Sequence, residues 1–494
     1  MSEEETDVMI GLETHIQLDT ETKLFCGCPN EEAEEPNTHV CPTCLGHPGS
    51  KPRLNKKVLE HAVKTSQALQ CDVNEEVFFS RKTYFYPDLS KDYQITQYEV
   101  PVAEDGEVEI KVGDEKKDIG ITRLHIEEDP AKTRHKGGDI GNSDYTLVDY
   151  NRSGTPLLEI VTEPDFTSPK EARAYLQQLA QMLEYLEIYY PESNFALKSD
   201  ANISIDGGQR VEVKNITGTA GIEKALSYEI SRQKQLKKRG REVSQQTRSY
   251  NQNQEITEKL REKETEEDYG YIFDPDLTTQ ELDEEFREKL RAEIPELPHE
   301  KFKRFKEEYG LKDKLVEALV SVPEMADDFE RLAEEFDTNL AASWMVGELK
   351  KVLNYNEVSY DEVNVESGAP DFLYVGLRVV LSHLEAGEFN QRKAEKYLRD
   401  FVEQGLDPEK EFSIDDPKAD NIDLGLNLKD YKKSGDDEIT EFVKEAIDEN
   451  PDAVEDYNSG DEEAVNFLVG QVMSISQGKA DPKTAREKIL EELE

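Results

Sequence analysis

The chain lacks any long apolar run, and no stretch approaches the roughly 20 consecutive apolar residues that a membrane-spanning helix requires. It begins Met-Ser-Glu-Glu-Glu-Thr-Asp, without the basic and apolar segments of an export signal. It contains no Walker loop and no Gly-x-Gly-x-x-Gly turn, so a nucleotide site of the P-loop or Rossmann type is excluded. We therefore expect a soluble, cytoplasmic protein without a membrane partner.

Basic residues are scarce: 60 Lys and Arg oppose 109 Asp and Glu, which gives the 494 residues a formal charge of −49. Such acidity often indicates disorder, but 36% of the residues are hydrophobic, including 21 Tyr and 18 Phe, which is enough to build cores. Self-repulsion of this size is screened at molar salt, where the Debye length is about 3 Å. The composition predicts a folded protein with an acidic surface, suited to the cytoplasm of an extreme halophile.

The length and patterning of the chain predict several domains. Residues 1–292 mix alternating strand patterns, turns and helices, whereas the remaining residues have almost wholly helical patterns. We predict an α+β fold in which a mixed domain, 1–292, precedes a helical domain, 293–405, and a small helical tail, 406–494. A clear helix start is Ser168-Pro-Lys-Glu171, which supplies an N-cap, a first-turn proline and a capping-box glutamate.

Cysteine is rare, yet four of the five cysteines lie close together, as Cys26-Gly-Cys28 and Cys41-Pro-Thr-Cys44. Two thiol pairs at this spacing suit a tetrahedral Zn²⁺ with four thiolate ligands. A reducing cytoplasm disfavours disulfides, while a redox dithiol pair or incidental thiols are the alternatives. Because four thiolates leave no open position for substrate, zinc here would stabilise a small knob and would carry no chemistry.

The segment Ile10–Leu18 alternates with a period of two, which indicates a strand. Its apolar residues share one face, and Glu13 and His15 project side by side from the other face. A lone histidine in such a place is more often a satisfied strand residue than a ligand.

Two further strand patterns carry acids. Residues 119–126 lead into the acidic cluster 127–129, which by itself is most simply a solvated strand end, and residues 156–162 place Glu159 within an apolar run. A buried carboxylate is costly without a partner, so we predict a cationic partner for Glu159. Jointly, these acids and a histidine have the chemistry to hold a hard divalent cation such as Mg²⁺, which takes oxygen ligands.

Residues 81–88 place Arg81 and Lys82 beside three aromatics that include Tyr84. This composition suits nucleotide phosphates and a stacked base, and a half-buried edge strand explains it equally well. Lys214 adds a cation in a second basic stretch.

A predicted helix, 220–239, ends in a cluster of Lys and Arg that reaches residue 241. These cations complement the helix dipole, and they are also candidate phosphate contacts.

These motifs, taken in order, resemble one known family: the B subunit of the archaeal and bacterial aspartyl/glutamyl-tRNA amidotransferase. The resemblance covers nearly the whole chain. The matching segments are Ile10–Leu18, Leu24–Cys28, Val40–Gly46, Arg81–Asp88, Tyr93–Gln97, Arg123–Asp129, Asp149–Glu159, Asp200–Ser204, Asn339–Trp344 and Asn450–Gln471.

The resemblance implies an enzyme subunit that uses ATP and Mg²⁺ to phosphorylate the side-chain carboxylate of Glu or Asp mischarged on tRNA(Gln) or tRNA(Asn). Ammonia released from glutamine by an amidase A subunit then attacks the acyl phosphate, and a small C subunit supports the heterotrimer. The implied fold is a cradle domain that bears the active site and a zinc knob, then a helical domain, then a tail that contacts the misacylated tRNA.

Carried over position by position, the resemblance implies that His15, Glu128 and Glu159 hold the catalytic Mg²⁺, with Glu13 beside them. It also implies zinc at the four cysteines. The alternative is a non-catalytic tRNA-binding scaffold, in which the acids belong only to the acidic surface.

We predict the roles of the basic residues from their positive charge. Phosphoryl transfer depends on positioning and on charge neutralisation, so we expect Lys82 to act in catalysis and Arg81 to neutralise phosphate oxygens. Tyr84 and Lys214 complete the predicted ATP-binding set.

Overall fold

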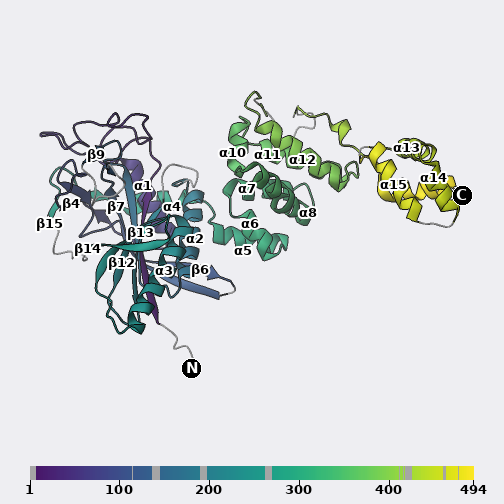
Figure 1. Ribbon diagram of the computed structural model, residues 1–494. Coiled ribbons are helices and arrows are strands. Elements are labelled where there is room, and N and C mark those ends of the chain that lie inside the picture. Colours follow the sequence, from purple (N-terminus) through teal and green to yellow (C-terminus); the bar gives the residue numbers. More distant parts are fainter. Residues whose placement is uncertain are drawn as a thin grey trace. The chain divides into compact units, whose positions relative to one another are not determined.

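The computed structural model describes residues 7–113, 115–135, 145–189, 197–261, 270–410, 412–414, 417, 425–459, 463–476 and 478–493. The chain divides into two compact units, Met1–Pro298 and His299–Glu494. The first unit is coloured purple to teal in Figure 1 and combines strands with helices, whereas the described residues of the second contain helices alone. The predicted α+β class, a mixed N-terminal region followed by a helical region, is confirmed.

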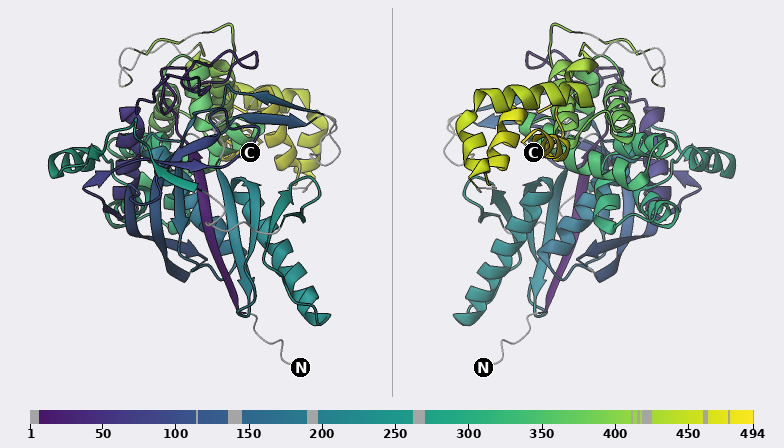
Figure 2. Two further views of the ribbon diagram at one scale, coloured as in Figure 1. Left: turned by 90° about the vertical axis from the view of Figure 1, so that its left-hand side faces the viewer. Right: turned by 90° about the vertical axis from the view of Figure 1, so that its right-hand side faces the viewer.

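One large sheet organises the first unit. Within the described residues it has nine strands, and all neighbours are antiparallel except β12 and β13. The N-terminal β1, drawn in purple, lies in the middle of this sheet (Figure 2). The strand order is β14 (Ile256–Arg261), β13 (Gln246–Asn251), β12 (Val211–Thr217), β11 (Lys198–Ile205), β1 (Val8–Gln17), β10 (Pro156–Thr162), β7 (Glu115–Glu128), β6 (Ala103–Val112) and β2 (Asp72–Val73).

Smaller sheets and helices α1 to α4 complete the described part of the first unit. The small sheets are β15 (Gly270–Phe273) with β4 (Ser80–Thr83) and β5 (Tyr93–Thr96), β16 (Gln280–Glu281) with β3 (Glu76–Val77), and β8 (Lys132–His135) with β9 (Thr146–Asp149). The helices are α1 (Lys56–Ala68), α2 (Pro169–Tyr185), α3 (Gly218–Lys238) and α4 (Glu284–Ala292).

Helices α2 and α3 pack against one face of the large sheet. Ile10, Leu12 and Ile16 of β1 are buried in the same cluster as Tyr175 of α2 and Ala225 of α3, as the period-two pattern predicts. The opposite face of β1 therefore presents its polar residues.

The start of α2 follows its sequence pattern. The Ser168 hydroxyl accepts a hydrogen bond from the backbone N–H of Glu171, and the proline occupies the first turn. The Glu171 carboxylate in turn accepts from the backbone N–H of Thr167.

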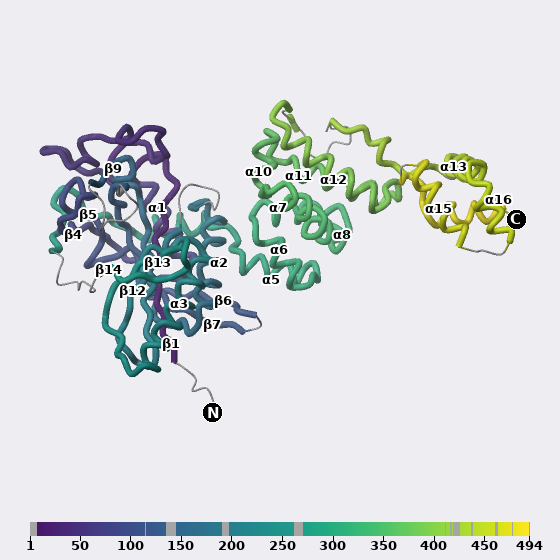
Figure 3. The backbone as a smooth tube through the Cα atoms, in the orientation of Figure 1, coloured from purple at the N-terminus to yellow at the C-terminus, as the bar shows by residue number. Residues whose placement is uncertain are grey.

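The second unit is a succession of helices, drawn as a tube in Figure 3. Its described residues form two hydrophobic clusters, one whose buried members run from Phe305 to Tyr431 and one from Ile439 to Ile489. The domain boundaries at 292 and 405 stay predictions. The helices are α5 (Pro298–Tyr309), α6 (Asp313–Leu319), α7 (Pro323–Ala333), α8 (Thr338–Ser343), a π-helical turn η3 (Trp344–Leu349), α9 (Lys350–Asn356), α10 (Tyr360–Glu366), α11 (Phe372–Glu385), α12 (Gln391–Gly405), a 3₁₀ turn η4 (Leu428–Asp430), α13 (Asp436–Glu449), α14 (Pro451–Asn458), α15 (Glu463–Ile475) and α16 (Pro482–Leu493).

None of the described helices combines the length and the apolar character that crossing a membrane requires.

Candidate active site and metal centre

A row of charged side chains crosses the middle of the large sheet on the face opposite α2 and α3. The strand register sets His15 of β1 against Glu159 of β10, and Glu159 against His125 of β7. On the other side of β1, Glu13 lies opposite Asp200 of β11. Antiparallel pairing thus brings together groups that are far apart in the chain, such as His15 and Glu159, which are 144 positions apart.

The first part of this row is a cluster of His15, Glu127 and Glu159. His15 Nε2 lies 3.0 Å from Glu159 Oε2 and 3.9 Å from Glu127 Oε1. Burial disfavours a charged imidazole, but the hydrogen bond and charge of Glu159 outweigh it and raise the pKa of His15 to about 10. His15 is therefore the cationic partner predicted for Glu159.

One imidazolium does not neutralise two buried carboxylates. Burial and the charge of Glu159 raise the pKa of Glu127 to about 7. Ligand atoms of His15, Glu127 and Glu159 all lie within 4.8 Å of one another. Two carboxylates with a shared excess of negative charge fit Mg²⁺, which takes oxygen ligands from one or two carboxylates.

Glu128 is not part of this cluster. Its carboxylate is paired with the Lys91 ammonium and accepts a hydrogen bond from the backbone N–H of Ile95 at 2.9 Å. Successive residues of a strand point to opposite faces, and Glu128 shares its face with the buried Ile126. The predicted grouping of Glu128 with His15 and Glu159 is thus corrected, and the carboxylate that joins them is Glu127.

His125 adds a second imidazole beside Glu159, with Nε2 3.8 Å from Glu159 Oε2. Burial lowers the pKa of His125 to about 4, so this ring is neutral at pH 7.

The second part of the row gathers three acids around Lys214 of β12. Lys214 Nζ lies 2.5 Å from Asp200 Oδ2 and 3.4 Å from Glu212 Oε1. Glu13 joins them through Asn202, whose amide donates to Glu13 Oε1 at 2.9 Å. Burial, reinforced by the charge of Glu159, raises the pKa of Glu13. Lys214 is therefore tied to acids of the sheet.

The two predicted phosphate-binding cations on β4, Arg81 and Lys82, have different surroundings. Arg81 donates to Asp274 at 2.8 Å and to Asp276 at 3.1 Å, so its charge is neutralised within the chain. The charge of Lys82, the next residue, offsets part of the rise in the pKa of Glu127, so Lys82 lies within electrostatic range of the His15 cluster. Tyr84, just past β4, is half-buried.

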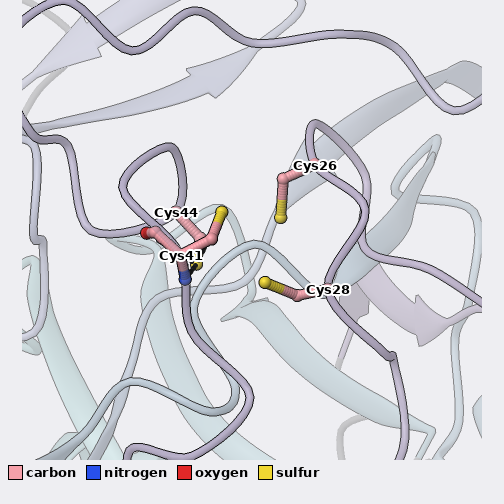
Figure 4. A group of neighbouring side chains, drawn as sticks. All are labelled: Cys26, Cys28, Cys41 and Cys44. Carbon is pink, nitrogen blue, oxygen red and sulfur yellow. Dashed lines mark hydrogen bonds between the residues drawn. The ribbon is translucent and has the colours of Figure 1, made fainter.

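The four cysteines converge from two loops. Figure 4 shows Cys26 and Cys28 on one loop and Cys41 and Cys44 on another, with their sulfurs facing a common space. All four sulfurs lie within 4.8 Å of one another, and those of Cys41 and Cys44 are 3.9 Å apart. Four sulfurs bound to zinc at about 2.3 Å are about 3.8 Å apart in a tetrahedron. The cluster fits a structural zinc, as predicted.

The charge state of Cys44 also suits a metal ligand. The pKa of Cys44 is lowered to about 5, mainly by a hydrogen bond from the Cys26 thiol. The backbone N–H of Cys41 and the charge of Lys23 also lower this pKa, whereas burial opposes the change. A thiolate is therefore already favoured at one of the four positions.

Sequence reasoning included Glu127 only as part of the acidic cluster 127–129, and it missed Lys91, Asp200 and Glu212 as members of these groups. Only Glu127 had a local signal. Apolar residues at 124 and 126 assign the even positions of that strand to the core, so the odd position 127 belongs to the polar face. Lys91 lies in a loop and reaches Glu128 only through tertiary folding.

Comparison with known proteins first identifies the class. Residues 8–288 match the family described as GatB/GatE catalytic domain, and residues 327–493 match the GatB domain. The charged row and the cysteine cluster both lie inside the segment that matches the catalytic domain.

The particular family follows from whole-length relatives, each named as the B subunit of aspartyl/glutamyl-tRNA(Asn/Gln) amidotransferase. The chain is 42% identical to that of Natronomonas pharaonis, over 98% of this chain and 97% of the relative. It is 42% identical to that of Haloarcula marismortui, over 99% and 98%, and 44% identical to that of Methanoregula boonei, over 97% and 96%.

The chain belongs to this family of amidotransferase B subunits. The family, the enzyme class and the activity predicted from its motifs are thereby confirmed: it is a subunit of the tRNA-dependent amidotransferase, a carbon–nitrogen ligase of translation that converts misacylated Glu- or Asp-tRNA to Gln- or Asn-tRNA.

Proposed function

We propose that this chain carries the phosphorylation step of that conversion. A side-chain carboxylate oxygen of the mischarged Glu or Asp attacks the γ-phosphorus of ATP, and ADP leaves with the bridging oxygen. Ammonia then attacks the carbonyl carbon of the acyl phosphate, which loses inorganic phosphate and a proton to give the amide. The observation that carries the proposal is the group of buried acids around His15, on the sheet face opposite α2 and α3.

The residues have separate roles in this step. Glu127 and Glu159 would hold Mg²⁺ together with His15, which must lose its proton before the imidazole can bind the metal, and the bound metal would neutralise charge on the phosphate oxygens. Lys82 adds positive charge beside the same cluster and would face the transferred phosphoryl group. Glu13 limits the approach of further anions from the side of β11.

Two of the predicted ATP-binding residues, Arg81 and Lys214, form ion pairs within the chain and receive a structural role. Arg81 is paired with Asp274 and Lys214 with Asp200. We therefore propose that these pairs stabilise β4 and β12 at the nucleotide site and that the two cations do not bind phosphate directly. Tyr84 is the candidate for base stacking.

The ammonia and the tRNA come from outside the chain. We propose an amidase A subunit and a small C subunit as partners in a cytoplasmic heterotrimer, with misacylated tRNA as substrate. A net charge of −49 repels RNA, so tRNA recognition rests on shape, stacking and local cations. The end of α3 and the segment 479–488 of the tail are the candidate cationic contacts.

The test uses the assembled complex with Glu159→Gln, which removes a charge and keeps the size. We expect ATP consumption that depends on misacylated tRNA to vanish, while basal release of ammonia from glutamine persists, because that reaction belongs to the amidase partner. Glu107→Gln, on the exposed face of β6, is the matched control and should keep both outputs. Normal ATP turnover by Glu159→Gln would instead support the non-catalytic scaffold.

A further inference from the structure

The cysteine loops and the end of β7 share a cavity of about 90 Å³. Cys26, Cys44 and Gly46 line it on the side of the loops, and Lys91 and Glu128 line it on the other side. The predicted structural knob therefore lies across a small cavity from a buried ion pair whose acid, Glu128, immediately follows Glu127 in the chain.

The backbone carbonyl of Cys44 is the main connection between the two. It accepts a hydrogen bond from the Ser90 hydroxyl at 2.7 Å and another from the Ser153 hydroxyl at 3.3 Å. Ser90 directly precedes Lys91, whose ammonium is paired with Glu128. The carbonyl of Cys44, a predicted metal ligand, thus orients the segment that contains Ser90 and Lys91.

Close packing adds a second connection at Gly46. Its φ of +66° lies in the left-handed region, and a Cβ on this residue would lie 2.5 Å from Cγ of Lys91 and 3.0 Å from its Cα. The cysteine loop therefore rests against the stem of Lys91, and only glycine allows this approach.

We propose that the four-cysteine site is a positioning element for the Lys91–Glu128 pair, and that Ser90 transmits its effect. A metal bound by Cys44 and three further thiolates restrains the Cys44 backbone and hence the carbonyl that holds Ser90. Without the metal, the two loops lose their common anchor, and Lys91 loses one of the contacts that keep it on Glu128. The inference concerns the geometry of the pair and depends on the proposed phosphorylation only for its effect on rate.

The backbone amide of Ile95 reports directly on this geometry, because it donates to Glu128 Oε1 at 2.9 Å. The experiment takes the full chain in its assembled complex, removes zinc with a chelator, and follows hydrogen exchange at Ile95 together with zinc release. We expect exchange to rise about tenfold, the change expected when a hydrogen bond to a charged acceptor is weakened.

Variants of Ser90 test the hydrogen bond to the Cys44 carbonyl separately from metal binding itself. Ser90→Ala should retain zinc, should raise exchange at Ile95 in the loaded protein, and should respond less to the chelator, while Ser90→Thr should restore the normal behaviour. Ser50→Ala is the matched control, since the Ser50 hydroxyl donates to the carbonyls of Pro42 and His47 within the cysteine loop. It should leave exchange at Ile95 unchanged.

Three results would overturn the proposal. Unchanged exchange at Ile95 after zinc removal would limit the cysteine site to its own loops. Equal behaviour of Ser90→Ala and Ser50→Ala, or loss of zinc from Ser90→Ala, would remove Ser90 as the transmitting residue. If the phosphorylation is also correct, Ser90→Ala should lower kcat with little change in the Mg²⁺ requirement, and failure of that reaction alone would leave the exchange result intact.

Discussion

The His15 cluster of the sheet unit and the Asp328 network of the helical unit differ in the hydrogen bonds that their buried carboxylates receive. In the sheet unit, His15 is hydrogen-bonded to Glu159 but lies 3.9 Å from Glu127, and Glu127 is driven toward its neutral form. In the helical unit, Asp328 receives a hydrogen bond from Arg331 at 2.8 Å and another from the Tyr360 hydroxyl at 2.7 Å.

This difference separates a functional cluster from a structural one. A donor from its own helix, Arg331, and one from α10, the Tyr360 hydroxyl, satisfy the carboxylate of Asp328, so its network holds α7 to α10 without any added ion. The acids around His15 repel one another, which raises the pKa of Glu127, so a bound cation would relieve their repulsion. The predictions below test this contrast, from the largest expected effect to the smallest.

The largest effect is expected from Glu127→Gln. If this carboxylate holds Mg²⁺, its loss should reduce tRNA-dependent ATP turnover by about 100-fold or more and raise the Mg²⁺ concentration required. Glu128→Gln should loosen Lys91 but leave the Mg²⁺ requirement near its normal value. Magnesium titrations of the two variants in one assay decide between them, and a shifted requirement only in Glu128→Gln would reverse the assignment.

Loss of a thiolate should have the next largest effect. Cys41→Ser is expected to lower zinc content from about one per chain after dialysis against a chelator, and to destabilise the cysteine loops, because metal binding is part of their folding free energy. Cys71→Ala is the control, since this buried cysteine lies outside the cluster. Elemental analysis gives the result, and full zinc retention by Cys41→Ser would exclude a four-thiolate site.

A smaller effect is expected from the pH dependence of Asp328. Burial raises its pKa from 3.8 to about 6 despite its hydrogen bonds. The folded state therefore binds a proton more readily than the unfolded state, and the contribution of this group to stability grows as the pH falls from 7 to 4. Two pKa units correspond to roughly 3 kcal/mol at most.

Urea unfolding of the wild type and Asp328→Asn across this pH range, at constant high salt, measures the difference. The wild type should gain stability relative to the variant on acidification. Parallel profiles would show that Asp328 does not titrate in this range.

The smallest effect is expected at the exposed pair of Lys116 and Glu109, which are 2.6 Å apart with side chains 63% and 54% exposed. Lys116→Ala should change the free energy of unfolding by less than about 0.5 kcal/mol, because water and salt screen such a pair. A change of several kcal/mol in thermal unfolding would contradict the distinction between buried and exposed charge.

The sequence by itself determined the local features of this protein. Alternation in Ile10–Leu18 assigned Glu13 and His15 to one face, because side-chain direction in a strand depends only on position. The spacing of the cysteines predicted a cluster that the structure forms, and the cap at Ser168 predicted the start of α2. Each of these signals is carried by residues that are close together in the chain.

Only the tertiary structure decided which distant groups meet. The strand order sets Glu159 beside His15, and the register of β7 against β10 brings the end of β7 close to both of them. The pairing of Lys91 with Glu128 likewise depends on how a loop folds over the sheet. Strand order, register and loop packing minimise the free energy of the whole domain, so no local pattern of residues could have specified them.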